Sequence, residues 1–314
     1  AGIRCGERRR AREYRELCRR IFEGERAHYA GFDFEDNNEN TGWFIYDDIM
    51  WWTISLARAY AAFGDEEYLR LSEQSFSRVW YGSERVGDTG SYDETGGGMF
   101  WRWYPISNPE PNRPGDGKMA CINFPAAVAA LTLAECVPEG RTEPAGERPV
   151  THTRERYFEM GREIYEWGVE NLFDAATGRV ADSRHGDGEP DWKSHVYNQG
   201  TFIGASVLLY RATGEGRYLT NALLAADYVM RDMSKDGILP FESGIEQGIY
   251  TAIYAQYMAM LVYDCGQRQY LPFLRHNMAA GWANRDAVRD ICGGEYARRV
   301  ERGQTVDSYS ASGL

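Results

Sequence analysis

The amino-acid sequence predicts an all-α fold, a barrel in which inner and outer helices alternate. Apolar segments of helical length recur along the 314 residues, and each is followed by a segment that is polar on one face. A helix that is apolar all round is typically buried, whereas a helix with one polar face lies at the surface. Alternating apolar and polar residues never run long enough in the sequence to indicate a sheet.

The expected helices follow one another in pairs. A first helix, residues 14–29, carries one apolar stripe among Arg and Glu residues. Four pairs of an inner and an outer helix come after it, with the bounds 49–63 and 68–80, 121–136 and 157–169, 198–213 and 218–230, and 250–265 and 270–283. Three of the inner helices run into a glycine, at Gly64, Gly214 and Gly266, as is common at helix C-termini.

Repeated helical hairpins of this kind build either an open solenoid or a closed ring. The outer helices begin at Tyr68, Tyr157, Tyr218 and Tyr270, at intervals of 89, 61 and 52 residues. A solenoid keeps a nearly constant period, so these unequal intervals favour a closed (α/α) barrel with long loops over one mouth. Because no Ser/Gly-rich linker divides the chain, we expect residues 1–314 to form a single catalytic domain.

Composition excludes several classes of partner. The net charge is −12 and the chain has only three lysines, which argues against binding to nucleic acid. No apolar run approaches the roughly 18 residues of a membrane span, and no cleavable signal peptide is visible. We therefore expect a soluble monomer, either cytoplasmic or secreted after removal of a leader. The six cysteines include no C-x-x-C pair, so buried free thiols are expected rather than a metal cluster.

The most informative stretch is residues 41–52, TGWFIYDDIMWW, which places two adjacent carboxylates, Asp47 and Asp48, among aromatic rings. The flanking aromatic residues are Trp43, Phe44, Tyr46, Trp51 and Trp52. Acids among large rings suggest tuned protonation beside a surface on which sugars stack. The structural alternative is the start of a helix, where the dipole favours acidic side chains and the aromatics face a core.

Further polar and aromatic clusters precede the other inner helices. Residues 87–114 contain Trp101 and Trp103, which could equally be core residues. Residues 175–197 carry several acids and His195 before a Tyr-Asn-Gln-Gly sequence, and residues 237–248 carry Glu242 and Gln247. In a closed barrel the starts of the inner helices face the same end, so these clusters converge as a carbohydrate cleft requires.

Paired carboxylates are the groups that cleave glycosidic bonds. They lie about 5–5.5 Å apart in retaining enzymes and about 6.5–9.5 Å apart in inverting ones, and the adjacency of Asp47 and Asp48 suits the shorter distance. One of the two must stay protonated although the helix N-terminus stabilises both anions, so repulsion and burial must raise one pKa. The five histidines form no pair at metal-ligand spacing, and no nucleophile-elbow or phosphate-binding motif is present. We expect no cofactor and no metal.

The sequence resembles glycoside hydrolase family 76, the endo-α-1,6-mannanases and their fungal wall-modifying relatives. The segments that carry the resemblance span most of residues 41–314: YDDIMWW, GGGMFWRW, KMACINFPAAVAAL, YNQGTFIGASVLLYRATGE and ANRDAVRDICGG. The resemblance implies an (α/α)6 barrel and a retaining mechanism, with Asp47 as the nucleophile and Asp48 as the acid/base. Because four inner–outer pairs are visible in place of six, we expect a barrel that is incomplete at the chain ends.

The predicted function is hydrolysis of α-1,6-mannan or a related α-mannoside with retention of configuration. The expected substrate-binding residues are Trp43, Tyr46, Trp51, Trp52, Trp101, Trp103, Lys118, Asn123, Tyr197, Asn198, Gln199, Glu242 and Gln247. Three alternatives stay open: a transglycosidase of the same family, a sugar isomerase, and a glycan-binding barrel without catalysis. The isomerase would need a histidine pair at the barrel mouth, where the sequence offers only His195.

Overall fold

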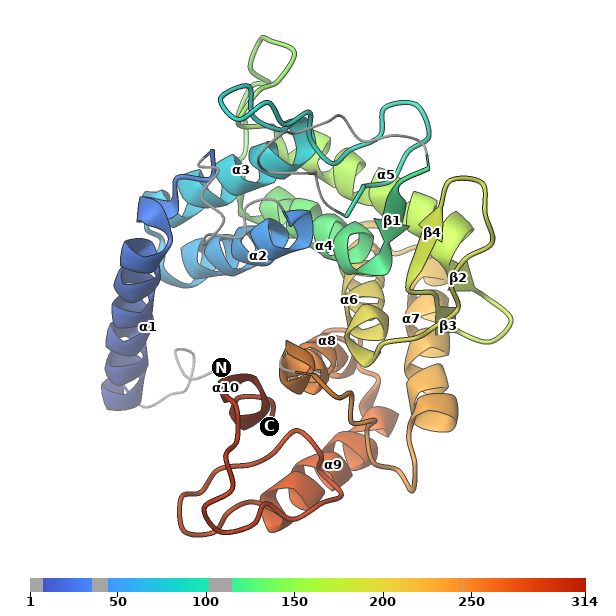
Figure 1. The fold of residues 1–314 in the computed structure, drawn as a ribbon. Helices are drawn as coiled ribbons and strands as arrows, with labels where there is room; N and C mark the ends of the chain where they lie inside the picture. The colour runs from blue at the N-terminus through green and yellow to red at the C-terminus, as the bar shows by residue number, and fades with distance from the viewer. Residues whose placement is uncertain (1–7, 36–44, 102–114, 245) are drawn as a thin grey trace.

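A computed structural model defines residues 8–35, 45–101, 115–244 and 246–314 (Figure 1). The longer helices are α1 (Arg8–His28), α2 (Tyr46–Phe63), α3 (Glu66–Tyr81), α4 (Ala120–Cys136), α5 (Arg154–Leu172), α6 (Val196–Thr213), α7 (Gly216–Tyr228), α8 (Tyr250–Tyr263) and α9 (Leu271–Ala283). The short ones are η2 (Ala30–Phe32), the π-helical turn η4 (Val229–Met233), η5 (Glu246–Ile249), η6 (Arg268–Tyr270) and α10 (Ser308–Ala311).

The helices form an inner and an outer row. Helices α2, α4, α6 and α8 pack side by side in that order around the middle of the molecule (Figure 1). Helices α3, α5 and α7 cover them from outside, and each packs on the inner helix that precedes it in the chain. This arrangement confirms the predicted all-α class and the barrel of inner and outer helices. No helix in the described part of the chain is long and apolar enough to cross a membrane.

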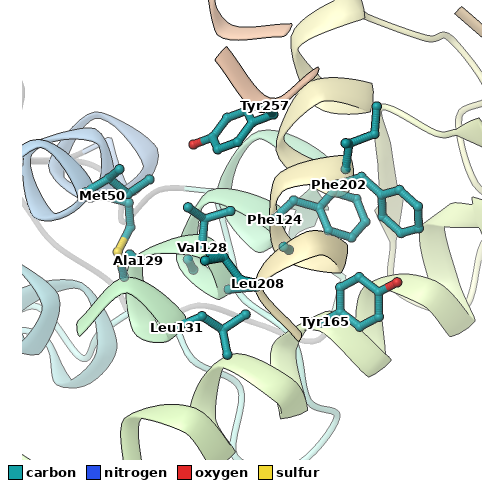
Figure 2. Packing of buried hydrophobic residues seen from close by; sticks show 14 of the residues in the cluster. Met50, Phe124, Val128, Ala129, Leu131, Tyr165, Phe202, Leu208 and Tyr257 are labelled. Carbon is teal, nitrogen blue, oxygen red and sulfur yellow. The ribbon is translucent and has the colours of Figure 1, made fainter. Parts of the chain in front are cut away.

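The inner helices are buried because their residues are apolar or small on every side. In α4 every residue from Ala120 to Leu133 is buried, and α6 is buried from Asn198 to Leu209. Figure 2 shows where these helices meet: Phe124 of α4 lies against Phe202 of α6, with ring centroids 5.0 Å apart. Burying one such ring stabilises the fold by about 1.5–3 kcal/mol.

Two glycines let α6 approach α8 closely. A Cβ atom at Gly200 would lie 2.7 Å from the Cα atom of Tyr254. One at Gly204 would lie 2.2 Å from the Tyr257 ring. Neither distance is compatible with a side chain, so the backbone of α6 itself forms the contact surface for the tyrosines of α8.

The strands are very short, as expected from the lack of long alternating runs. Strand β1 (Gly117–Met119) pairs with β4 (Ser183–His185) in antiparallel register, with Lys118 opposite Arg184. Strand β2 (Phe173–Asp174) pairs with β3 (Arg179–Val180). The first of these pairs joins the chain that enters α4 to the loop that precedes α6. It therefore fixes two loops at the same end of the barrel.

Two of the inner helices begin earlier than expected. Helix α2 begins at Tyr46 and α6 at Val196, three and two residues before the predicted positions, whereas α8 begins at the predicted residue. In α2 the two aspartates interrupt the apolar pattern, yet the first turn of a helix tolerates polar residues because its N–H groups are free to bond with acceptors. The two aspartates of α2 thus belong to the helix itself rather than to the loop before it.

The close packing of α6 on α8 can be tested by adding one methyl group. Gly204→Ala should lower the free energy of unfolding by about 1–3 kcal/mol, because the new Cβ must displace the Tyr257 ring. Gly216→Ala, at the start of α7, is the matched control: nothing lies within 4 Å of its Cβ position. We expect it to change stability by less than about 1 kcal/mol. Urea denaturation measures both, and equal effects would contradict the packing described.

Candidate active site

Asp47 and Asp48 lie in the first turn of α2. No side chain caps this helix; the backbone N–H of Tyr46 instead donates to the carbonyl oxygen of Trp101 at 3.1 Å. The dipole of the helix favours acidic side chains in this turn. Asp47 is half-buried and Asp48 is exposed, so one carboxylate lies deeper in the site than its neighbour.

A buried ion pair anchors the residue before the two acids. The Tyr46 side chain is fully buried, and its hydroxyl donates to Asp88 at 2.5 Å. The other oxygen of Asp88 pairs with Arg78, and both side chains are inaccessible to solvent. Arg78 also donates to the carbonyl oxygen of Phe34 at 2.9 Å. Tyr46 was predicted to bind substrate, but this position below the site makes it a support for the start of α2.

Asp47 is held by a side-chain donor. The indole N–H of Trp101 donates to its Oδ1 at 3.1 Å. The thiol of Cys121, at the start of α4, lies near the same carboxyl group and favours its anion. Trp101 is positioned in turn by its backbone N–H, which donates to the carbonyl oxygen of Gly117 at 3.1 Å. The carboxylate of Asp47 therefore has a fixed orientation relative to the loop before α4.

Both carboxyl groups resist ionisation. Burial, assisted by the charge of Asp48, raises the pKa of Asp47 to about 8. The Cys121 thiol and the indole N–H of Trp101 act in the opposite direction because both favour the anion. The Asp48 side chain is exposed overall, yet the neighbouring protein displaces part of the water around its carboxyl group. This loss of water, followed by the charge of Glu246, raises the pKa of Asp48 to about 6. The pair thus retains a proton at a pH at which an ordinary aspartate, with a pKa of about 3.9, is ionised.

Tyrosines from α6 and α8 form the opposite side of the site. The ring centroids of Tyr197 and Tyr250 lie 4.0 Å apart, with the ring planes tilted by 32°. His195 precedes Tyr197, and its ring contacts both Glu242 and, at 3.7 Å, Asp182. Glu242 also accepts the backbone N–H of Val196 at 3.0 Å. It thereby caps α6, in addition to holding His195.

Several predicted substrate-binding residues support the site from behind. Lys118 contacts Asp93 at 2.7 Å and the carbonyl oxygen of Gly97. Its ammonium group also lies over the rings of Phe100 and Trp167, at 4.9 and 5.3 Å from their centroids. These contacts fix the loop that leads to Trp101.

Asn123 has a similar position. It is fully buried and hydrogen-bonds the backbone of Met99 in both directions, at 2.8 and 3.0 Å. Asn198 and Gln199 are also fully buried, and their amides have no hydrogen-bond partner among the described residues. These three amides thus lie beneath the surface of the site.

The remaining predicted residues have mixed positions. Trp51 and Trp52 are half-buried against the core, and Trp52 packs on Phe32 with ring centroids 4.9 Å apart. Gln247 is half-buried in η5, one residue after Glu246. Trp43 and Trp103 lie outside the described residues.

The sequence pattern gave no individual role to Cys121, Asp182, Glu246 or Tyr250, which the structure places near the pair or near Tyr197. Cys121 is the second residue of α4, as Asp47 is of α2, and Tyr250 is the first residue of α8. Their place at the start of an inner helix was the available signal. No group of three or more His, Cys, Asp or Glu residues in the described ranges could hold a metal ion.

A barrel of paired helices with two adjacent carboxylates among aromatic rings has the features of a glycoside hydrolase. The sequence model of glycosyl hydrolase family 76 matches residues 10–312. The chain belongs to this family.

Solved structures support the same fold. The α-1,6-mannanase GH76A of Salegentibacter sp. HEL1_6 is 24% identical, with a TM-score of 0.74 over 99% of this chain and 82% of that one. The Lin0763 protein of Listeria innocua is 23% identical, with a TM-score of 0.68 over 86% and 69% of the two chains. Dfg5 of Chaetomium thermophilum, in complex with glucosamine, is 16% identical, with a TM-score of 0.64 over 88% and 65%. Comparison with curated proteins gives no match.

The buried ion pair between Arg78 and Asp88 should be essential for the stability of the fold. Asp88→Asn should lower the free energy of unfolding by about 3–5 kcal/mol, because it leaves the buried charge of Arg78 uncompensated. Asp33→Asn is the control: its ion pair with Arg85 is exposed, so we expect a loss below about 1 kcal/mol. Urea denaturation measures the free energy of unfolding of both variants. If Asp88→Asn loses as little stability as Asp33→Asn does, the buried ion pair does not stabilise the fold as described.

The raised pKa of Asp47 should make this residue destabilising at high pH. Below about pH 4 the carboxyl group is protonated in both the folded and the unfolded chain, and Asp47→Asn should have little effect. As the pH rises, the Asp47 carboxyl group loses its proton in the unfolded chain before it does so in the folded chain, because folding raises its pKa. The unfolded state is therefore favoured in the wild type, whereas the variant has no carboxyl group to titrate and keeps its stability. Thermal unfolding at about pH 5 and about pH 8 should show the variant gaining Tm over the wild type at the higher pH. A gain that does not depend on pH would contradict the burial of this carboxylate.

Proposed function

We propose that this protein is a retaining glycoside hydrolase that cleaves α-1,6-mannan or a related α-mannoside. Asp47 is the nucleophile and Asp48 the acid/base. The observation that carries the proposal is the pair of adjacent carboxyl groups at the start of α2, both with raised pKa values. Membership of family 76 supports the hydrolase over the isomerase alternative.

The reaction proceeds in two displacements. Asp47 attacks the anomeric carbon while Asp48 gives its proton to the leaving glycosidic oxygen, which forms a glycosyl-enzyme. Asp48 then takes a proton from water, and the water oxygen attacks the same carbon and releases Asp47. The exposure of Asp48 suits a group that must meet both a leaving sugar and an incoming water, and the indole hydrogen bond to Asp47 suits a nucleophile that must hold one orientation.

Substrate binding must place the proton on Asp48. Burial favours the neutral form of Asp47, whereas the nearby Cys121 thiol and the hydrogen bond from Trp101 favour its anion. A sugar that covers Asp48 removes water from it and raises its pKa further. Asp48 then competes better for the shared proton, and Asp47 is left as the anion that the first displacement needs.

The walls of the site suit a neutral sugar. The tilted pair of rings of Tyr197 and Tyr250 and the indole of Trp101 offer apolar faces to C–H groups, and the indole N–H bonds to Asp47. Relatives support the same substrate class. Inactive variants of the Salegentibacter mannanase, in which two consecutive aspartates are changed, bind α-1,6-mannotriose and α-1,6-mannotetrose.

The assignment predicts that turnover depends on Asp48. Asp48→Asn should reduce release of reducing ends from α-1,6-mannan by about 10²–10⁴-fold, because the leaving oxygen loses its proton donor. Asp264→Asn, at the far end of α8, is the control and should retain activity. Undiminished turnover by Asp48→Asn would refute the role of Asp48 as the acid/base.

The stereochemistry of the wild-type reaction is a second test. Proton NMR should show the α anomer of the product first, and a β anomer first would exclude retention. Products longer than the substrate would indicate transfer to sugar rather than to water.

A further inference from the structure

Three consecutive glycines, Gly96, Gly97 and Gly98, lie in the loop between α3 and β1 and take no part in the proposed chemistry. They belong to a tight turn. The backbone N–H of Asp93 donates to the carbonyl oxygen of Gly98 at 3.0 Å, and the N–H of Gly97 donates to that of Asp93 at 2.9 Å. Gly97 and Gly98 have φ angles of 65° and 72°, which favour glycine. The turn ends three residues before Trp101.

The space that a side chain would need at each of these glycines is already occupied. A Cβ atom at Gly97 would lie 2.9 Å from the ring of Trp167, which belongs to the outer helix α5. One at Gly98 would lie 2.4 Å from the same ring, and one at Gly96 would lie 2.9 Å from the carboxylate of Asp93. The backbone of the turn therefore packs directly on the indole and on the carboxylate.

Trp167 makes two further contacts with this part of the chain. Its indole N–H donates to the carbonyl oxygen of Gly96 at 3.1 Å. The ammonium group of Lys118 lies 5.3 Å from the centroid of the Trp167 ring and 4.9 Å from that of Phe100. It also pairs with Asp93 at 2.7 Å, and Lys118 is only 9% exposed. A cation held by a carboxylate and attracted to two aromatic rings has few other positions open to it.

The same face of α5 holds the turn at a second point. Glu163, one helical turn before Trp167, accepts the hydroxyl hydrogen of Tyr92. Tyr92 pairs with Met99 across the base of the turn, and its ring stacks on Trp80 with centroids 4.2 Å apart. Residues four apart lie on one face of a helix, so α5 contacts both the base and the tip of the turn.

The end of the turn leads directly to the two acids. The backbone N–H of Phe100 donates to the carbonyl oxygen of Ser91 at 2.8 Å, which closes the turn. The next residue, Trp101, accepts the backbone N–H of Tyr46 at 3.1 Å. Its indole N–H donates to Asp47, also at 3.1 Å. The position of Trp101 therefore sets the direction of the hydrogen bond on the proposed nucleophile.

We propose that Trp167 is a positioning residue that acts on the reaction through the turn of residues 93–98. By holding this turn it fixes the indole of Trp101, which orients the carboxylate of Asp47. For its catalytic meaning this inference rests on the proposed function. Attack requires the reacting atoms to be aligned at about 3–3.5 Å, so a small displacement of the carboxylate slows the reaction while the rest of the site still binds the sugar.

Two substitutions of Trp167 separate its packing from its hydrogen bond. Trp167→Leu removes the ring and the donor, and it should lower kcat on α-1,6-mannan by about 10–100-fold. The KM should change by less than about threefold, because Trp167 acts on the reacting carboxylate rather than on sugar binding. Trp167→Phe keeps a ring against the glycines and loses the donor to Gly96, so its loss of kcat should be smaller.

The position of Trp101 can be measured without turnover. In protein labelled with nitrogen-15, NMR identifies the indole N–H signal of Trp101 by its loss in Trp101→Phe. In Trp167→Leu this hydrogen should exchange with solvent at least about tenfold faster than in the wild type, because its bond to Asp47 is formed less of the time. An exchange rate equal to that of the wild type would overturn the inference, even if the variant had a lower Tm.

A matched control separates positioning from general stability. Trp282 lies on another outer helix, α9, where it is 52% exposed and stacks on Arg285 at 3.9 Å from the ring centroid. Trp282→Leu makes the same chemical change and should leave kcat and the exchange of the Trp101 indole hydrogen at their wild-type values. If it alters both as much as Trp167→Leu does, Trp167 acts only through the stability of the fold and the inference fails.

The activity of the wild type separates this inference from the proposed function. If the wild type releases no reducing ends from α-1,6-mannan, the proposed function is refuted, and the exchange of the indole hydrogen still decides whether Trp167 positions Trp101. If the wild type is active and Trp167→Leu has the same kcat, the role of Trp167 in the reaction is refuted.

Discussion

The site depends on the buried ion pair between Arg78 and Asp88. Both side chains are inaccessible to solvent, and Asp88 also accepts the hydroxyl hydrogen of Tyr46, the residue directly before the two aspartates. A charge taken out of water is costly unless its partner is fixed, so the pair tolerates very few positions of its neighbours. The start of α2 is therefore held from below, and the two carboxylates project from a rigid turn.

The same turn carries a conflict between burial and charge. A folded chain gains nothing from two carboxyl groups side by side, and the raised pKa values of both groups reflect an environment that disfavours their charge. Trp101 reduces this cost for Asp47 by donating a hydrogen bond to it. Such a balance between burial and a donor is consistent with the proposed roles of the two acids as nucleophile and proton donor.

Residues that resemble sugar ligands in the sequence can serve the loops instead. Lys118 and Asn123 attach the segment that ends in Trp101, through Asp93 in one case and Met99 in the other. Both residues thereby help to position the indole that donates to Asp47. The aromatic and amide residues named as substrate ligands stay predictions, as does the expectation that residues 1–314 act as a single domain.

The sequence by itself determined the fold class and the order of inner and outer helices, because helical periodicity is a local property, and it predicted the Asp47–Asp48 pair as the reactive site from adjacency. It placed the start of α2 too late, since the two aspartates there interrupt the apolar pattern. Only the tertiary structure decided that Cys121 lies near Asp47, that Tyr197 and Tyr250 face each other, and that the Tyr46 side chain is buried on Asp88. Those facts depend on how four helices distant in the chain pack against one another, and no short stretch of residues encodes that contact.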